Sequence, residues 1–187
     1  ASARSDALTE GELGNMTKGG LTRLERFIAR TSAQRACIDA ASRATENVPG
    51  DVWEVGLGNG RTYDHLRERF PGRTIVVFDR EIAAHPDCVP SGDMMRLGDF
   101  QTTIPEEIAR GEGRVAVIHA DIGTANIEKS RAMGRWLAPI FAAALAPGGY
   151  LIGDQPMEDA AFEKLNLPDA GSGAMPEDAY FFYRKRG

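Results

Sequence analysis

The sequence predicts an α/β protein with a doubly wound, mostly parallel sheet, and three observations lead to this fold class. Short apolar segments alternate with amphipathic ones from residue 51 onwards. The apolar segments are nearly continuous, which is typical of strands that are buried on both faces of a parallel sheet. A carboxylate stands near the end of each of five expected strands: Glu54, Asp79, Asp99, Asp121 and Asp154. Ligands of such sheets bind beyond the carboxyl ends of the strands, so we expect these five side chains to line one crevice.

The elements follow from this pattern in order. Residues 1–20 are polar and are expected to form a loose arm. Two helices should follow, the second capped by Thr31 or Ser32. Period-2 and period-3.6 patterning then predicts strands at 51–55, 74–78, 94–97, 114–118, 150–153 and 179–184. It predicts helices at 62–70, 105–110, 127–145 (with a kink at Pro139) and 158–165. A flexible loop is expected around residues 171–173.

A single domain is expected over residues 1–187. Within it, residues 1–50 would form the arm and capping helices, 51–154 the ligand-binding core, and 155–187 a C-terminal helix and edge strand. One clear strand candidate, rich in aromatic residues, follows residue 154, so the sheet should have a reduced antiparallel C-terminal edge. The same aromatic residues could instead form a contact between copies of the chain, so a homo-oligomer stays open.

Composition narrows the class of protein. The 187 residues carry a net charge of −5, with 26% charged and 42% hydrophobic residues, which is ordinary for a soluble globular protein. The acidic balance disfavours a nucleic-acid partner. No apolar run is long enough for a membrane span, and the N-terminal residues do not resemble a signal peptide. We therefore expect a cytoplasmic protein whose two cysteines, Cys37 and Cys88, are reduced thiols.

The most specific motif is a glycine turn that follows the first expected strand, with the pattern Glu54-x-Gly56-x-Gly58-x-Gly60. A dinucleotide fingerprint, G-x-G-x-x-G, would require a third glycine where Arg61 stands. This spacing argues against a pyrophosphate at the start of the next helix.

The pattern resembles that of class I S-adenosylmethionine-dependent methyltransferases. Three further landmarks occur in the order of that family: Asp79 at the end of the second strand, Gly98-Asp99-Phe100 after the third, and the segment 145–149 (L-x-P-G-G) before the fifth. The resemblance covers about residues 51–154. It implies a Rossmann-like methyltransferase fold with S-adenosylmethionine as methyl donor and S-adenosylhomocysteine as product.

The resemblance also implies roles for individual residues. Glu54 would act near the methionine end of the donor, Asp79 would accept from both ribose hydroxyls, and Asp99 with Phe100 would hold the adenine. The full set of expected cofactor-binding residues is Glu54, Gly56, Leu57, Gly58, Asn59, Gly60, Thr62, Asp79, Arg80, Asp99, Phe100 and Asp121. A phosphate-free sulfonium cation suits an acidic site better than a pyrophosphate does.

Residues that act on the acceptor are less clearly marked, because methyl transfer is an in-line displacement that chiefly needs alignment. Asp121, His119 and Asp154 are the candidate catalytic residues. His119 could be a general base or a buried histidine with a hydrogen-bond partner. Asp121, Asp154 and Gln155 resemble the metal ligands of catechol-type O-methyltransferases, so Mg²⁺ is an option. The chain departs from that pattern, with Gln155 in place of Asn and Thr124 where a Lys is usual.

The acceptor is expected to be a small molecule with an oxygen or nitrogen nucleophile. The chain lacks the Asp-Pro-Pro-Tyr and Pro-Cys motifs of nucleic-acid methyltransferases. Arg23, Arg26 and Arg30 share roughly one helix face and could bind an anionic acceptor or lie solvated. Two alternatives remain, namely an aminopropyltransferase on the same fold and a non-catalytic S-adenosylmethionine-binding protein.

Overall fold

The computed structural model describes residues 20–111, 114–171 and 179–187. The arm expected at 1–20 lies outside these residues except for Gly20, and so does most of the loop expected at 171–173. Of the helices described, none is long and apolar enough to cross a membrane.

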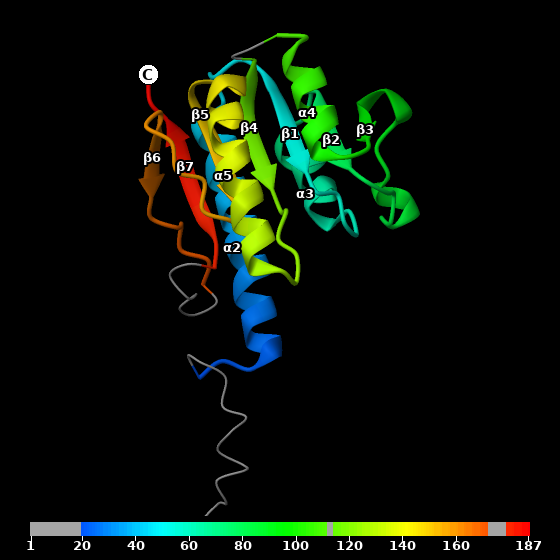
Figure 1. Cartoon of the computed structure of the whole chain (residues 1–187). Coiled ribbons are helices and arrows are strands. Elements are labelled where there is room, and N and C mark those ends of the chain that lie inside the picture. Colours follow the sequence, from blue (N-terminus) through cyan, green and yellow to red (C-terminus); the bar gives the residue numbers. More distant parts are fainter. Residues whose placement is uncertain (1–19, 112–113, 172–178) are drawn as a thin grey trace, which may run out of the picture.

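The core of the molecule is a seven-stranded mixed sheet with the order β3-β2-β1-β4-β5-β7-β6 (Figure 1). Its strands are β1 (Asp51–Val55), β2 (Ile75–Asp79), β3 (Met95–Leu97), β4 (Val115–Ala120), β5 (Leu145–Gly153), β6 (Phe162–Leu165) and β7 (Phe181–Lys185). Strands β1 to β5 pair in parallel, and β7 runs antiparallel to both of its neighbours. The doubly wound fold predicted from the sequence is confirmed.

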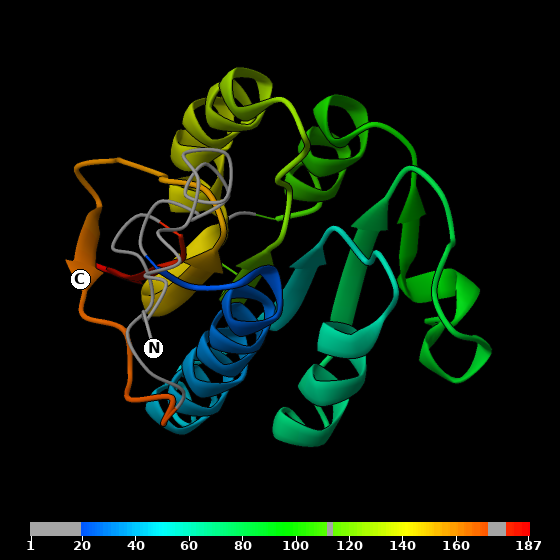
Figure 2. The same ribbon diagram turned by 90° about the horizontal axis from the view of Figure 1, so that it is seen from below.

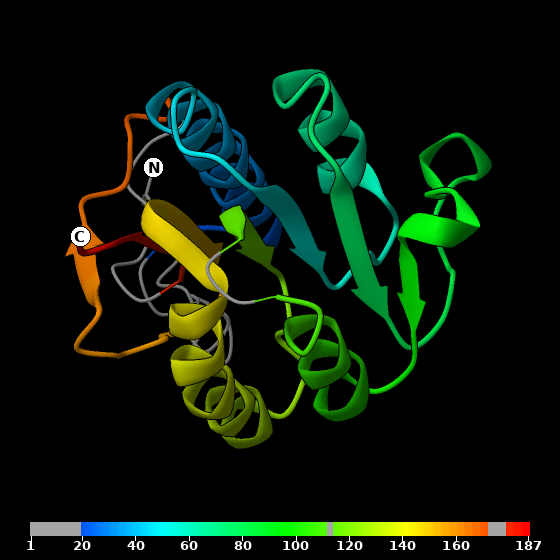
Figure 3. The same ribbon diagram turned by 90° about the horizontal axis from the view of Figure 1, so that it is seen from above.

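Helices cover both faces of the sheet, as Figures 2 and 3 show from opposite ends. One face carries α2 (Arg23–Ala44) and α3 (Arg61–Arg69), and the other carries α4 (Phe100–Ile108) and α5 (Ile127–Ala144). Two single-turn 3-10 helices, Pro86–Cys88 and Gly92–Met94, lie between β2 and β3. Each face has its own apolar core, one built around Phe78, Ile118 and Phe141 and the other around Ile38, Leu66 and Val77.

The order of the strands determines where a ligand can bind. The chain moves outward from β1 through β2 to β3, then returns to place β4 on the other side of β1. The carboxyl ends of β1 and β4 therefore flank the topological switch point, where open α/β sheets bind their ligands. In Figure 1 the N-terminal part of α2 extends past this end of the sheet.

The N-terminal region differs from the prediction, because one continuous helix replaces the two that were expected. Thr22 caps α2, with its Oγ1 accepting from the Glu25 N–H at 3.2 Å and Glu25 Oε2 accepting from the Thr22 N–H at 2.6 Å. The Thr31 hydroxyl donates to the Phe27 and Ile28 carbonyls, so this threonine lies inside the helix instead of starting one. A threonine in mid-helix can bond back to the preceding turn, which removes the need for a break.

The C-terminal region also differs. The helix predicted at 158–165 is wrong, because residues 162–165 form β6, which pairs with β7 from Phe162↔Lys185 to Leu165↔Phe182. The antiparallel edge has two strands where one was predicted. Pairing with β7 and burial of Phe162 override the local helix propensity here. In α5 the helix continues through Pro139.

Candidate functional site

A cavity of about 780 Å³ lies at the carboxyl ends of the central strands. It is lined by the glycine turn after β1, the end of β2, the start of α4 and the loop after β4. Two helices, α2 and α5, complete its wall. The lining residues are Phe27, Arg30, Thr31, Gln34, Gly56, Leu57, Gly58, Asn59, Arg61, Thr62, Asp79, Arg80, Phe100, Gln101, Asp121, Ile122, Gly123, Thr124, Lys129, Ser130, Ala132, Met133 and Trp136.

Each of the three positions in the turn requires glycine for a different structural reason. Gly56 has φ +95°, and a Cβ there would lie 2.2 Å from the Asp121 carbonyl oxygen, so this glycine lets the loop after β4 pack against the turn. Gly60, the N-cap of α3 with φ +83°, would place a Cβ 2.5 Å from Cβ of Cys88. Gly58, with φ +51°, has no neighbouring atom within 4 Å of a Cβ position, and it lines the cavity. Gly58 therefore leaves its cavity side open to a ligand.

Asp79 lines the cavity at the end of β2, as predicted. Its Oδ2 accepts from the Gly58 N–H at 3.0 Å, and its Oδ1 accepts from the Arg80 N–H at 2.6 Å. These two bonds fix the carboxylate against the glycine turn. Oδ1 also accepts from the Glu81 N–H at 3.4 Å, whereas Oδ2 keeps a lone pair and can still accept a bond from a ligand.

Asp99, unlike its neighbour Phe100, does not line the cavity. Its Oδ1 caps α4 by accepting from the Gln101 N–H at 2.9 Å, and its Oδ2 pairs with Arg80 Nη2 at 2.8 Å. Phe100 and Gln101 do line the cavity. The structure thus brings only part of the Gly98-Asp99-Phe100 motif to the site.

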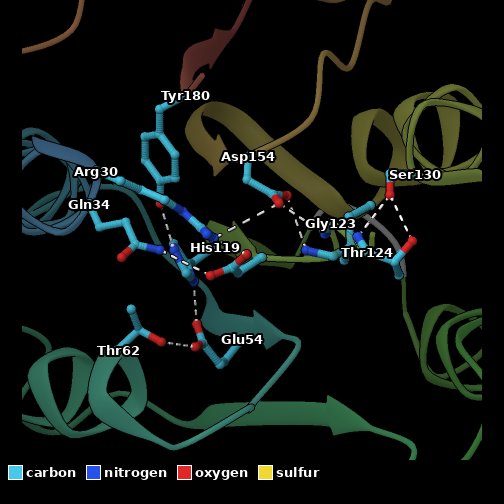
Figure 4. A network of polar contacts seen from close by, with 12 residues as sticks. Arg30, Gln34, Glu54, Thr62, His119, Gly123, Thr124, Ser130, Asp154 and Tyr180 are labelled. Carbon is cyan, nitrogen blue, oxygen red and sulfur yellow. Dashed lines mark hydrogen bonds and ion pairs between the residues drawn. The ribbon is translucent and has the colours of Figure 1, made fainter. Parts of the chain in front are cut away.

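Glu54 and His119 are both fully buried, and Figure 4 shows them in a row between Thr62 and Tyr180. Glu54 Oε2 is 2.6 Å from His119 Nδ1, and Glu54 Oε1 accepts from the Thr62 hydroxyl. His119 Nε2 is 2.7 Å from the hydroxyl of buried Tyr180. Neither Glu54 nor His119 is part of the cavity wall, so the buried-histidine alternative applies and His119 is not placed to act as a general base.

Burial and charge act in opposite directions on His119. Burial lowers the pKa of the imidazole, but the Glu54 carboxylate and, further away, Asp121 and Asp154 raise it, and the net pKa lies above its usual value. Burial raises the pKa of the Tyr180 hydroxyl well above its usual range. The pair lies inside the sheet, and the Thr62 hydroxyl links Glu54 to the cavity wall.

Asp121 lines the cavity just after β4 and is held from α2. Arg30 Nη2 forms an ion pair with Asp121 Oδ1, and Gln34 Nε2 donates to Oδ2 at 3.1 Å. Figure 4 shows Arg30 and Gln34 extending from α2 over the end of the sheet. These contacts fasten the N-terminal helix to the site, and their residues are 91 and 87 positions from Asp121 in the sequence.

Asp154 supports the same loop from β5 instead of facing the cavity. Its two carboxylate oxygens accept from the Ile122 N–H at 3.1 Å and the Gly123 N–H at 2.9 Å. Burial and the nearby Asp121 carboxylate raise the pKa of Asp154. A Cβ on Gly123 would lie 2.1 Å from Asp154 Oδ2, so only glycine allows this close approach.

The expected metal ligands do not form a suitable site for Mg²⁺. The Asp121 oxygens are engaged by Arg30 and Gln34, and those of Asp154 by backbone amides. Gln155 bonds to Asp154. Within the described ranges, no three His, Cys, Asp or Glu side chains gather as metal ligands. A cation would have to displace the Arg30 guanidinium, so we derive no chemical step through a metal.

Several residues of the site carry no sequence signal. Gln34 and Tyr180 are far from any motif, and their roles depend on contacts with Asp121 and His119. Trp136, Met133 and Lys129 line the cavity from α5. The amphipathic pattern of α5 indicates which of its side chains face the interior of the protein. It does not indicate which of them face the cavity and which pack on the sheet. Both cysteines are unpaired, and burial raises the pKa of Cys37 to about 12.

The chain resembles known methyltransferases over most of its length. It matches the family model described as S-adenosyl-L-methionine methyltransferase over residues 21–185. A solved S-adenosyl-L-methionine methyl transferase from Silicibacter pomeroyi DSS-3 is 38% identical, with a TM-score of 0.81 and 88% of this chain and 99% of that chain covered. TrmN from Thermus thermophilus shares the fold alone, at 13% identity and a TM-score of 0.53, covering 79% of this chain and 48% of that one.

No curated protein matches the chain. The family model covers most of the sequence, and its description agrees with the glycine turn, Asp79 and Phe100 around one cavity at the switch point of the sheet. The chain therefore belongs to the S-adenosyl-L-methionine methyltransferase family, and it is an S-adenosylmethionine-dependent methyltransferase of the class I fold.

Proposed function

We propose that this methyltransferase acts on a small-molecule acceptor that binds in the same cavity as the methyl donor. The observation that carries the proposal is the division of the cavity wall. One part is formed by the glycine turn, Asp79 and Phe100, which are the family's cofactor landmarks. The other part is formed by side chains of α2 and α5, outside those landmarks. A concave second part of this size, walled by side chains of two helices, suits a small acceptor better than a macromolecule.

The residues present fit the donor. The Asp79 carboxylate would accept bonds from the ribose hydroxyls, and Phe100 would pack against the adenine. The backbone of the turn, open at Gly58, would approach the methionine part, with Leu57 and Asn59 beside it. S-adenosylmethionine supplies a methyl group on a sulfonium cation, and the chain supplies its alignment with the acceptor.

Asp121 is the one predicted catalytic residue that lines the cavity, and we assign it the position beside the reacting groups. Arg30 and Gln34 hold its carboxylate in one orientation, which favours a fixed electrostatic role over a mobile one. His119 and Asp154 act through other residues. Buried His119 supports Glu54, and Asp154 holds the 121–124 loop.

Calorimetric titration with S-adenosylhomocysteine tests donor binding, and radiolabelled S-adenosylmethionine tests the acceptor. The labelled donor is incubated with the protein and either a fraction of small metabolites or a fraction of RNA and protein. We expect binding of the product and label in the small-molecule fraction. Label found only in RNA or protein would refute the small-molecule acceptor. Binding without transfer to either fraction would favour the non-catalytic alternative.

A further inference from the structure

The wall of the cavity carries more cations than carboxylates although the chain as a whole is negative. Four cationic side chains line the cavity, namely Arg30, Arg61, Arg80 and Lys129, against two carboxylates, Asp79 and Asp121. The net charge of the chain is −5. Arg80 is paired with Asp99 on the donor side. Arg30 and Lys129 come from α2 and α5, the helices that form the second part of the wall, and Arg61 is the first residue of α3 and reaches Phe27 of α2.

Two of these cations have no carboxylate partner. Among the described residues, neither the Arg61 guanidinium nor the Lys129 ammonium forms an ion pair. Arg61 instead stacks over the Phe27 ring, with 6.0 Å from its Cζ to the ring centroid. Phe27 itself lines the cavity although its residue surface is 52% exposed. This contact holds the Arg61 charge at the mouth of the cavity.

Arg30 supplies an independent observation. Its Nη2 is used by Asp121 and lies 3.9 Å from Asp154 Oδ2. Its Nε is buried and has no hydrogen-bond partner in the described part of the chain. Buried polar atoms are normally satisfied, and a guanidinium carries five N–H donors in a fixed plane. The Arg30 side chain as a whole is 41% exposed, so its guanidinium can hold Asp121 and present its remaining N–H groups to a second anionic group.

The remaining wall is apolar and partly aromatic. Phe27, Met133 and Trp136 line the cavity beside the three cations, and Met133 and Trp136 also pack against one apolar core. Aromatic and thioether side chains favour a flat apolar body. We infer that the acceptor is an anionic molecule with an apolar, ring-like body, whose acid group is bound by Arg30, Arg61 and Lys129. This inference rests on the proposed function and adds the substrate class.

The test measures binding of four small probes to the protein saturated with S-adenosylhomocysteine. Benzoate and phenyl phosphate carry an anion on a ring, benzamide is the neutral isostere, and benzylamine is the cation. Affinities are read by ligand-observed NMR titration, which detects weak binding. We expect both anions to bind about tenfold or more tightly than benzamide, and benzylamine not to bind. The ratio of benzoate to phenyl phosphate affinity distinguishes a carboxylate from a phosphate acceptor.

Matched variants locate the effect. Lys129→Gln removes a cavity cation from α5, and Arg135→Gln removes an exposed cation of the same helix outside the cavity. Arg30→Lys keeps the charge but loses the planar set of guanidinium donors, and Arg35→Gln is its exposed control on α2. We expect Lys129→Gln and Arg30→Lys to weaken the binding of both anions by about tenfold and to leave the affinity for benzamide unchanged. The controls should behave as the wild type.

Each result has a defined meaning. Equal affinity for benzoate and benzamide, absence of binding by every probe, or identical effects of Lys129→Gln and Arg135→Gln would overturn the inference. Binding of S-adenosylhomocysteine is measured first, so its failure identifies a failure of the proposed function instead. Unchanged S-adenosylhomocysteine affinity in Lys129→Gln shows that the variant is folded and that its loss concerns the acceptor half alone.

Discussion

Glu54 and His119 form a fully buried polar contact between adjacent strands, with 2.6 Å between Oε2 and Nδ1. The two residues are directly opposite each other in the register of β1 and β4. Tyr180 completes the contact from the segment that leads into β7, and Thr62 completes it from α3. A single network thus ties together two strands, the segment before β7 and the helix that follows the glycine turn. Its role is to hold the cavity floor.

This network predicts a pH dependence of stability. Burial is the largest single effect on His119 and lowers its pKa, but the charge and hydrogen bond of Glu54, together with the charges of Asp121 and Asp154, raise it, so the pKa lies above 6.5 in the folded state. A raised folded-state pKa gives stability that is complete below the unfolded pKa and is lost as pH rises through the folded pKa. The free energy of unfolding should therefore fall as pH rises above about 6.5. Urea unfolding at a series of pH values measures it.

The isosteric variant Glu54→Gln removes the attraction that raises this pKa. It should be less stable than the wild type at pH 6, and the decline above that pH should be shallower. His85→Gln is the control, because this side chain is 68% exposed. If Glu54→Gln kept the wild-type decline while His85→Gln abolished it, the assignment to His119 would be wrong.

The two glycines Gly56 and Gly58 should respond differently to alanine. At Gly56 the new methyl group would lie 2.2 Å from a backbone carbonyl oxygen at a φ of +95°. We expect destabilisation of about 3 kcal/mol or more, because neither backbone can move freely. At Gly58 no atom lies within 4 Å, so Gly58→Ala should cost about 1 kcal/mol of left-handed strain. Urea unfolding of both variants checks the difference, and equal losses would contradict it.

Asp79 and Asp99 should differ in their effect on donor binding. Asp79→Asn removes a carboxylate from the cavity wall, and we expect S-adenosylhomocysteine affinity to fall by about tenfold or more. Asp99→Ser keeps a cap for α4 but removes the carboxylate, which is outside the wall. The affinity of this variant for S-adenosylhomocysteine should stay within about twofold of the wild-type value. Calorimetry measures both. A large loss in Asp99→Ser would restore the adenine contact expected from the sequence.

The capping box of α2 should matter for stability. Thr22→Ala removes the side-chain acceptor for the Glu25 N–H, and we expect a loss of about 1 kcal/mol. Thr22→Ser keeps the hydroxyl and should be nearly neutral. Thermal unfolding compares the two variants. An unchanged Thr22→Ala would show that α2 does not depend on this cap.

Methyl transfer should not depend on magnesium. Arg30 and Gln34 engage Asp121, and backbone amides engage Asp154, so neither carboxylate presents a free pair of oxygens to a cation. Turnover after treatment with EDTA is expected to equal that of the untreated enzyme. Restoration of a lost activity by added Mg²⁺ would contradict the structure of this site.

The sequence by itself determined the order of strands and helices from β1 to β5, because local patterns mark both strands and turns. Asp51–Val55 and the start of α5 at Ile127 were placed by an apolar run and a helical period. The glycine spacing, Asp79 and Phe100 indicated the donor side through their resemblance to the methyltransferase family, and each stands directly after an expected strand. These are properties of neighbours in the chain.

Only the tertiary structure decided the features that depend on contacts between residues far apart in the sequence. A strand buried on both faces does not reveal which face an individual side chain takes, so Glu54 was expected in the crevice and lies beneath it. Residues 162–165 form a strand because β7 offers hydrogen-bond partners that their own sequence does not announce. Arg30 reaches Asp121 across 91 positions of sequence. Such contacts depend on packing and charge between distant segments, and these set the floor and the acceptor side of the cavity.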